Sequence, residues 1–160
     1  MASSDHFLRP SYLESLLNKM VGLLARYGWG PSYIHLLEVR GRKTGRIYRT
    51  PVNLHPMDGR QFLVGGRGHT AWSRNAGAGG VVILRRGRYS ASYRTIPVSN
   101  NDKPPILKSY LDAYSKTVQR FFDVPAGAPL EAFRRIVDRH PVFELIKSDD
   151  TSAGLRRRES

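Results

Sequence analysis

The chain has 160 residues, 40% of them hydrophobic, which is enough apolar material for one folded domain and excludes a wholly disordered chain. It carries 26 lysine and arginine residues against 13 acidic ones, a net charge of +13, which favours an anionic partner. Cysteine is absent, which excludes disulfide bonds, thiolate nucleophiles and Cys-ligated metal or iron–sulfur sites.

The first predicted element is an amphipathic helix over residues 11–27. Its apolar residues recur at the i, i+3, i+4, i+7 spacing of a helix with one buried face. Ser11 and Glu14 have the spacing of a capping box at the start of this helix. We expect the apolar face to pack on the core. Peripheral contact with the inner face of a membrane is the alternative, for which Lys19 and Arg26 form only a thin basic face.

The middle of the chain is predicted to form β-strands. Asp58-Gly59 is a strong hairpin turn signal, and Gly87 separates a second pair of strand-like runs. A short helix is expected over residues 71–76, between these two pairs. The predicted strands cover residues 33–39, 48–57, 61–65, 81–86 and 89–98. Five strands joined by tight turns predict a small antiparallel barrel in an α+β fold, and not alternating βαβ units.

Beyond the last of these strands the pattern changes to helices. An apolar helical stripe follows a pair of prolines, which suit the first turn of a helix. The predicted elements are a helix to about residue 122, a shorter helix over residues 129–139 and a last strand over residues 142–146. We expect one domain over residues 1–147, followed by a flexible tail over residues 148–160.

Basic residues are concentrated in one segment, between Val39 and Arg94. It contains twelve lysine and arginine residues against a single acid, Asp58, and therefore has a net charge of +11. The same segment holds ten of the fifteen glycines. Such a concentration predicts a binding surface for an anion, whereas the alternative is a generically basic protein whose arginines are spread over a sheet.

The run Gly41-Arg42-Lys43-Thr44-Gly45, the basic loop, is predicted to bind an anion. Its glycines permit sharp turns and let backbone N–H groups converge on an oxyanion. Arg42 can bind a phosphate or carboxylate through two hydrogen bonds, Lys43 adds a point charge and Thr44 adds a hydroxyl donor. The residue order differs from that of a Walker A loop.

A second run, Gly65-Gly66-Arg67-Gly68, the glycine loop, has almost no side chains. Bare backbone of this kind lets a planar ligand approach closely and form hydrogen bonds with it. The residues from Gly66 to Ala71 also match the dinucleotide pattern G-x-G-x-x-A. The predicted helix after them is too short for a βαβ crossover, so a Rossmann site is rejected.

These motifs occur together in one known family. The runs RGRKTGRIYRTPV and VGGRGHTAWSRN, separated by a hairpin, resemble the deazaflavin-dependent nitroreductases. Proteins of that family are split β-barrels that bind coenzyme F420, and the resemblance extends over roughly residues 12–98. It implies a small antiparallel split β-barrel, similar to the FMN-binding split barrels, with flanking helices.

The resemblance also implies which residues bind the cofactor. The basic loop would hold the phosphate and oligoglutamate tail of F420. Pro51 would line the deazaflavin ring, and the backbone of the glycine loop would contact it. The tryptophan and the asparagine of the predicted short helix would complete the pocket. The implied cofactor-binding set is Arg42, Lys43, Thr44, Pro51, Gly65, Gly66, Arg67, Gly68, Trp72 and Asn75.

The chemistry that the resemblance implies is hydride transfer between F420 and a small conjugated acceptor, such as a quinone, an enone or a nitro compound. The cofactor carries the hydride, so no side chain is expected to act as a nucleophile. The five histidines are scattered along the chain, and no metal site is expected. The expected partners are the anionic cofactor, a small-molecule acceptor and, by resemblance, a second copy of the chain.

Two other kinds of function stay open. The basic segment and its tyrosines suit a nucleic-acid-binding barrel, although this leaves the W-x-x-N element and the bare loop unexplained. A related split barrel could instead use FMN or haem, or only carry the deazaflavin. The first ten residues contain no apolar core of a signal peptide, and no run of 18 apolar residues occurs, so a cytoplasmic protein is expected.

Overall fold

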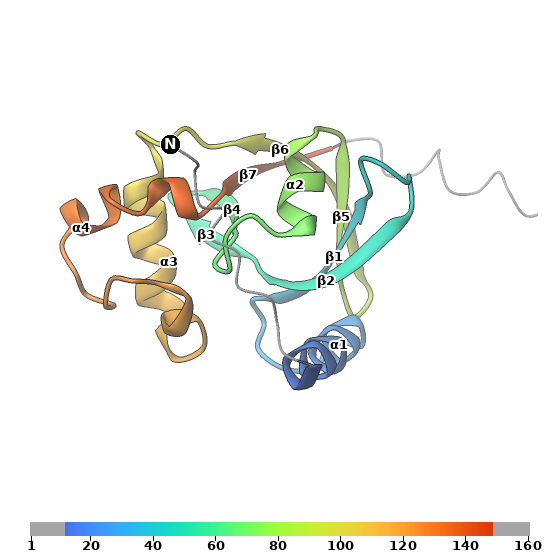
Figure 1. Cartoon of the computed structure of the whole chain (residues 1–160). Helices are drawn as coiled ribbons and strands as arrows, with labels where there is room; N and C mark the ends of the chain where they lie inside the picture. Colours follow the sequence, from blue (N-terminus) through green and yellow to red (C-terminus); the bar gives the residue numbers. More distant parts are fainter. Residues whose placement is uncertain (1–11, 149–160) are drawn as a thin grey trace, which may run out of the picture.

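The computed structural model describes residues 12–148, which form a seven-stranded antiparallel sheet flanked by helices (Figure 1). The strands are β1 (Ile34–Arg40), β2 (Ile47–Asn53), β3 (His55–Met57), β4 (Arg60–Val64), β5 (Val81–Arg86), β6 (Tyr89–Pro97) and β7 (Val142–Lys147). Their order in the sheet is β2-β1-β5-β6-β7-β4-β3. The sheet curls into a half barrel, which confirms the predicted α+β split β-barrel. The predicted cap at Ser11 and the predicted tail from residue 149 onward lie outside the described residues.

One extended segment supplies both edges of the sheet. Residues 48–57, predicted as a single strand, are divided at Leu54 into β2, which pairs with β1, and β3, which pairs with β4. At this break the backbone N–H of Leu54 donates a 2.8 Å hydrogen bond to the carbonyl of Tyr33. Because the two edges are covalently continuous here, the sheet is held in its curl. The prediction of one strand was wrong, because the local sequence of an extended segment does not indicate where its pairing partner changes.

The helices are α1 (Tyr12–Arg26), α2 (Ala71–Gly77), α3 (Lys103–Val118) and α4 (Leu130–Arg134), with two 3₁₀ turns, η1 (Gln119–Phe121) and η2 (Val137–Arg139). The helix predicted to reach about residue 122 is kinked at Tyr114 (φ −119°, ψ 20°) and gives way to η1. The helix predicted over residues 129–139 is only the five residues of α4, followed by η2. Helical geometry is lost at Ile136 (φ −115°, ψ 5°), whose side chain is buried in the core, so that tertiary packing and not the local pattern sets the end of the helix.

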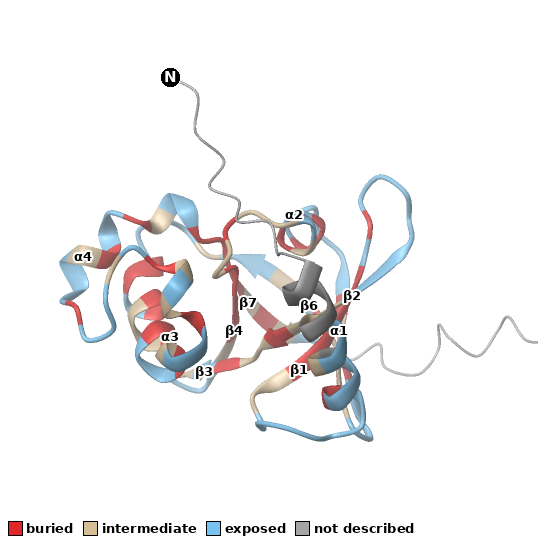
Figure 2. Ribbon diagram, turned by 60° about the horizontal axis from the view of Figure 1, so that its bottom comes forward, coloured by how far each residue is buried: buried red, intermediate tan, exposed pale blue. Residues whose placement is uncertain are grey.

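Two apolar clusters hold the helices to the sheet. The first lies between α3, α4 and one face of β4 and β7, and Phe62, Leu111 and Phe133 are fully buried in it. The second lies inside the curl against α2 and contains Leu37 and Leu84, which are also fully buried. Figure 2 shows the buried side of α3 turned toward the strands. Since each such side chain contributes about 1.5–3 kcal/mol when buried, these clusters fix α2 and α3 relative to the sheet.

Helix α1 has exposed apolar side chains among the residues whose burial is described (18–21 and 23–26), so the expectation that this face packs on the core is wrong in part. The helix lies against β1 and β2, and its Ala25 is fully buried. Met20, Leu23 and Tyr27 are nevertheless 57%, 53% and 66% exposed. Helical spacing predicts which residues share a face, but it does not show how much of that face a neighbouring element covers. Within residues 12–148, no helix is both long and apolar enough to cross a membrane.

Candidate functional site

A cavity of about 260 Å³ lies between α1, α3 and the sheet. Residues of β1, β2, β4, α2 and η1 also line it, together with the glycine loop that follows β4. Its wall is mostly apolar and aromatic with a few polar side chains, which is the usual composition of a small-molecule site. A second hollow, of about 650 Å³ between the β3–β4 hairpin and the start of α3, contains none of the predicted site residues. Its Arg60 donates two hydrogen bonds to Glu144.

Four of the ten residues predicted to bind the cofactor line the cavity. Pro51 is on β2, Gly66 and Arg67 are in the glycine loop, and Trp72 is in the first turn of α2. The other six are outside the lining. They are Gly65 and Gly68, within the glycine loop, and Arg42, Lys43, Thr44 and Asn75, which lie at or beside the basic loop.

The three glycines of the glycine loop have different roles. A Cβ at Gly65 would lie 2.5 Å from Cγ of Pro141, so a side chain does not fit there. At Gly66 a Cβ would meet only Cε2 of Phe122, at 3.7 Å, and this residue presents bare backbone to the cavity. Gly68 has φ +91°, a conformation that favours glycine. Close approach of a planar ligand therefore depends on Gly66, whereas Gly65 and Gly68 shape the loop.

Helix α2 connects the cavity with the basic loop. Trp72 lines the cavity and packs against Phe143, with 6.1 Å between the ring centres. Asn75 is buried, and its Oδ1 accepts hydrogen bonds from the backbone N–H of Arg42 at 3.2 Å and from Nη1 of Arg42 at 2.8 Å. The two residues expected to complete one pocket thus lie at different places, Trp72 at the cavity and Asn75 under the basic loop.

The basic loop forms the tight turn between β1 and β2. The N–H of Gly41 donates to the carbonyl of Arg46 at 2.7 Å, and a Cβ on Gly41 would lie 2.6 Å from the ring of Tyr48. Gly45 has φ +71°. Both glycines are therefore required by the turn itself, as the sequence predicts for a sharp loop.

The three polar side chains of the basic loop are exposed, but they have different contacts. Arg42 and Lys43 are exposed cations, which suits contact with an anion outside the turn. The hydroxyl of Thr44 accepts a 3.3 Å hydrogen bond from the N–H of Arg46 and lies 3.4 Å from the hydroxyl of Tyr48. Thr44 therefore supports the turn, in addition to any role toward a ligand.

The sequence offers Tyr110 and Tyr114 of the α3 stripe as candidates for contact with the acceptor, and of these Tyr110 lines the cavity, but the wall that α3 and η1 provide was not predicted. Tyr110 and Val118 belong to this stripe and line the cavity, as do Arg120 and Phe121 of η1. The guanidinium carbons of Arg67 and Arg120 lie 4.4 Å and 4.7 Å from the centre of the Phe121 ring. The only signal for this wall in the sequence is a tyrosine in an apolar stripe. A helix that packs on the core has the same apolar spacing, so this signal does not distinguish the two.

Tyr110 places a hydroxyl group at the cavity. The hydroxyl accepts a 3.3 Å hydrogen bond from Nδ2 of Asn53, which also lines the cavity. Burial raises the pKa of Tyr110, so the hydroxyl stays protonated at neutral pH. The cavity therefore contains a neutral hydrogen-bonding group.

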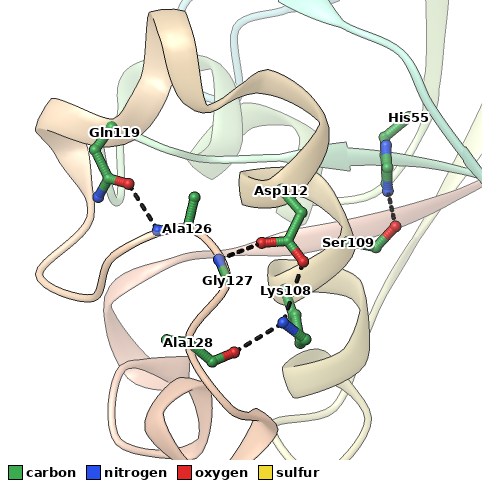
Figure 3. A network of polar contacts seen from close by, with 8 residues as sticks. All are labelled: His55, Lys108, Ser109, Asp112, Gln119, Ala126, Gly127 and Ala128. Carbon is green, nitrogen blue, oxygen red and sulfur yellow. Dashed lines mark hydrogen bonds and ion pairs between the residues drawn. The ribbon is translucent and has the colours of Figure 1, made fainter.

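A polar network holds α3 in the position that forms this wall (Figure 3). The carboxylate of Asp112 accepts a 2.7 Å hydrogen bond from the N–H of Gly127 and pairs with Lys108 at 3.1 Å. The hydrogen bond from Gly127 lowers the pKa of Asp112. On the sheet side, the hydroxyl of Ser109 lies 3.0 Å from Nε2 of His55. Helix α3 is thus bonded both to the loop before α4 and to β3.

The curled antiparallel sheet with its flanking helices defines a split β-barrel protein, and the cavity lies between the sheet and two of these helices. The family model of the F420H(2)-dependent quinone reductases matches residues 18–121 of this chain. The chain therefore belongs to the F420H(2)-dependent quinone reductase family, and the resemblance to a deazaflavin-dependent family is confirmed. The matched region contains all ten predicted cofactor-binding residues and ends before α4.

The chain is also similar to several solved structures, at low sequence identity. The protein Atu2129 of unknown function from Agrobacterium tumefaciens str. C58 is 17% identical, with a TM-score of 0.54 over 81% of this chain. This chain covers 54% of that protein, about half of its length. A structure described as a domain-swapped dimer is 17% identical, with a TM-score of 0.50 over 84% of this chain and 97% of that one. F420-H2 dependent reductase FDR-A is 20% identical, with a TM-score of 0.48 over 71% of this chain and 94% of that one. No curated protein matches the chain.

Proposed function

We propose that the protein binds F420 with the ring in the cavity and the anionic tail on the basic loop, and that it reduces a small conjugated acceptor. The family supports this proposal, and one structural observation carries it. Helix α2, of seven residues, has Trp72 at the cavity and Asn75 bonded to Arg42. The cavity, which could hold a flat ring, therefore lies beside the cations of the basic loop. A deazaflavin with a polyanionic tail needs these two features next to each other.

The groups at the cavity fit a planar ring. Pro51 and Trp72 provide apolar walls, and Gly66 leaves the backbone open to close approach. Arg67 stands at the same wall, with its guanidinium held on the ring of Phe121. An apolar pocket binds a flat heterocycle mainly by burying its surface. The few polar groups of the pocket then fix the orientation of the heterocycle.

The basic loop fits an anionic tail. A guanidinium has five N–H donors, and Arg42 directs Nη1 to Asn75 while the side chain stays exposed. This bond orients Arg42, which lowers the entropic cost of binding a phosphate or carboxylate. Lys43 adds a second exposed cation beside it.

F420H2, when bound, supplies the hydride, so the residues of this chain are needed to bind and orient rather than to form a covalent bond. Tyr110 is protonated at neutral pH and lines the cavity, where it can donate a hydrogen bond to an oxygen of the acceptor. Quinones, enones and nitro compounds all have such an oxygen. We therefore infer hydride transfer to an acceptor of this kind.

Fluorescence titration with F420 beside FMN tests the proposal. We expect saturable binding of F420 and none of FMN, and saturation by FMN alone would overturn the assignment. A second assay follows the oxidation of F420H2 by absorbance with a quinone, an enone and a nitro compound in turn. Binding of F420 without oxidation by any of the three would favour a deazaflavin carrier. The family match does not favour haem or nucleic acid, and we do not propose them.

The predicted homodimer and the predicted membrane contact are also proposals, and the exposed face of α1 is the surface for both. Met20 and Leu23 are exposed on this helix and Tyr27 directly after it, and Lys19 and Arg26 lie on the same segment. Analytical ultracentrifugation reports a mass of two chains if α1 pairs with a copy. Flotation with anionic liposomes reports lipid binding, and a monomer that does not float would reject both. The single domain over residues 1–147 and the cytoplasmic location likewise stay predictions.

A further inference from the structure

We propose that His140 is a positioning residue for the cofactor, because it holds the glycine loop in the conformation in which Gly66 faces the cavity. The inference rests on the proposed function, since it concerns the wall that the ring of F420 would meet. His140 directly follows η2, beyond residue 121, where the family match ends. His140 therefore lies outside the matched region.

The glycine loop begins as a continuation of the β4–β7 pairing. Val64 pairs with Val142 in that ladder, and the N–H of Gly65 then donates a 2.8 Å hydrogen bond to the carbonyl of Pro141. The ring of Pro141 occupies the space that a side chain at Gly65 would need, with Cγ 2.5 Å from an ideal Cβ. The position of Gly65 is therefore set by the segment that leads into β7.

The imidazole of His140 holds the next peptide group. Its Nδ1 lies 3.1 Å from the carbonyl oxygen of Gly65, and because a carbonyl only accepts, Nδ1 carries the proton and donates. The same oxygen accepts from the N–H of Gly68 at 3.0 Å. His140 is 1% exposed, so water does not compete for this bond. Two donors on one carbonyl set the orientation of the peptide that joins Gly65 to Gly66.

His140 is itself held by an aromatic contact that leads to the cavity. Its ring is stacked on Phe122, with 4.3 Å between the centres and 13° between the planes. Cε2 of Phe122 is the atom nearest to the Cβ position of Gly66, and Phe121 beside it lines the cavity. His140, Phe122 and Gly66 thus form a continuous contact from the C-terminal segment to the cavity wall.

His69, the residue directly after the glycine loop, is bonded to the same segment. Nε2 of His69 lies 2.9 Å from the carbonyl oxygen of Asp138 and donates to it. The carboxylate of Asp138 accepts a 2.6 Å hydrogen bond from Nδ2 of Asn100. A loop rich in glycine loses much conformational entropy on becoming ordered. Bonds to residues 138–141 order it before a ligand arrives, which should favour binding.

Two substitutions at position 140 separate the hydrogen bond from the ring. His140→Phe keeps a ring to stack on Phe122 and removes the donor to Gly65. His140→Asn keeps an amide donor close to the place of Nδ1 and removes the ring. We expect His140→Phe to weaken F420 binding about threefold to tenfold, the range of one net hydrogen bond. We expect His140→Asn to restore part of this loss.

The loop itself is measured by hydrogen–deuterium exchange in the protein without ligand. His140→Phe should speed exchange over residues 65–70, and F420 fluorescence titration below the unfolding temperature gives the affinity of each variant. Phe133→Leu is the matched control, because Phe133 is fully buried in the α3–α4 cluster. It should lower the thermal midpoint and leave both the affinity and the exchange of the loop unchanged.

The outcomes distinguish this proposal from the proposed function. Unchanged loop exchange and unchanged affinity in His140→Phe would overturn the positioning role. Equal effects of His140→Phe and Phe133→Leu on the loop would also overturn it, because general loss of stability would then explain both. A wild-type protein that does not bind F420 would reject the proposed function, while the exchange experiment would still decide whether His140 holds the loop.

Discussion

Asn75 and Arg42 are joined twice, because Oδ1 of Asn75 accepts from both the backbone N–H and Nη1 of Arg42, at 3.2 and 2.8 Å. The pair links α2, whose first turn carries Trp72 at the cavity, with the loop that we propose holds the anionic tail. Residues bonded in this way do not contribute independently, so changes at Asn75 and Arg42 should be coupled.

A double-mutant cycle tests this coupling. We expect Arg42→Ala to weaken F420 binding roughly tenfold, because a hydrogen bond to a charged group contributes about 1.5–3 kcal/mol and screening at an exposed loop favours the lower end. Asn75→Ala should cause a smaller loss, since it acts by releasing Arg42. The double variant should bind more tightly than the product of the two losses predicts, as measured by fluorescence titration of all four proteins.

A deazaflavin without the tail identifies which part of the cofactor the basic loop binds. Arg42→Glu should weaken binding of intact F420 more than Arg42→Ala does and should leave the tail-less form unaffected. Added salt should weaken binding of the intact form alone, because exposed charges are screened over about 10 Å at 0.1 M ionic strength. Equal losses for both forms would show that the loop supports the ring site or the fold.

Adjacent glycines should respond oppositely to added side chains. Gly66→Val should abolish binding of the ring with little change in the thermal midpoint, since a Cβ there meets only Phe122 at 3.7 Å. Gly65→Ala should destabilise the protein by about 1–3 kcal/mol, because its Cβ overlaps Pro141. Thermal unfolding and F420 titration of both variants give the comparison. Native stability with unchanged affinity in Gly66→Val would place the ring elsewhere.

The fluorescence of Trp72 should report binding directly. Trp72 lines the cavity, so energy transfer to or contact with the deazaflavin should quench it. Trp29 is the other indole and is 68% exposed, so Trp29→Phe removes its signal at little cost in stability. Titration of Trp29→Phe with F420 should show saturable quenching, and constant emission despite bound F420 would argue against the cavity as the ring site.

The stability of the protein should fall in mild acid because of a buried histidine. The hydroxyl of Tyr114 donates to the carbonyl of Leu54 at 3.3 Å, so Nδ1 of His55 donates to Tyr114 and Nε2 accepts from Ser109. Burial lowers the pKa of His55 below its usual 6.5. The unfolded chain then binds more protons than the folded protein below about pH 6.5, and the free energy of unfolding should decrease by at most about 1.4 kcal/mol per pH unit.

Urea unfolding between pH 5 and 8 measures this dependence. His55→Gln, which keeps a group near the place of Nε2, should have a smaller slope than the wild type. A residual slope is expected in the variant, because burial also lowers the pKa of His35. An identical slope in both proteins would assign the acid sensitivity to other groups.

Local patterns in the sequence were sufficient for most elements and turns. Asp58 and Gly59 have positive φ, 52° and 74°, as the predicted two-residue hairpin turn requires. The apolar stripe after Pro105 predicts α3, because residues on one helix face recur with the period of the helix itself. The two glycine-containing motifs also predict loops, and four of the ten residues selected from them and their surroundings line the cavity.

Contacts between distant segments were decided only by the tertiary structure. The break at Leu54, which gives one segment to both edges of the sheet, depends on which strands pair, and spacing along the chain does not encode the partner. For the same reason, no local pattern shows that Asn75 holds Arg42 or that His140 holds Gly65. Local patterns thus predicted most of the elements, the concentration of charge and the family motifs. The curl of the sheet and the packing of helices on it determined which of these residues meet at one cavity.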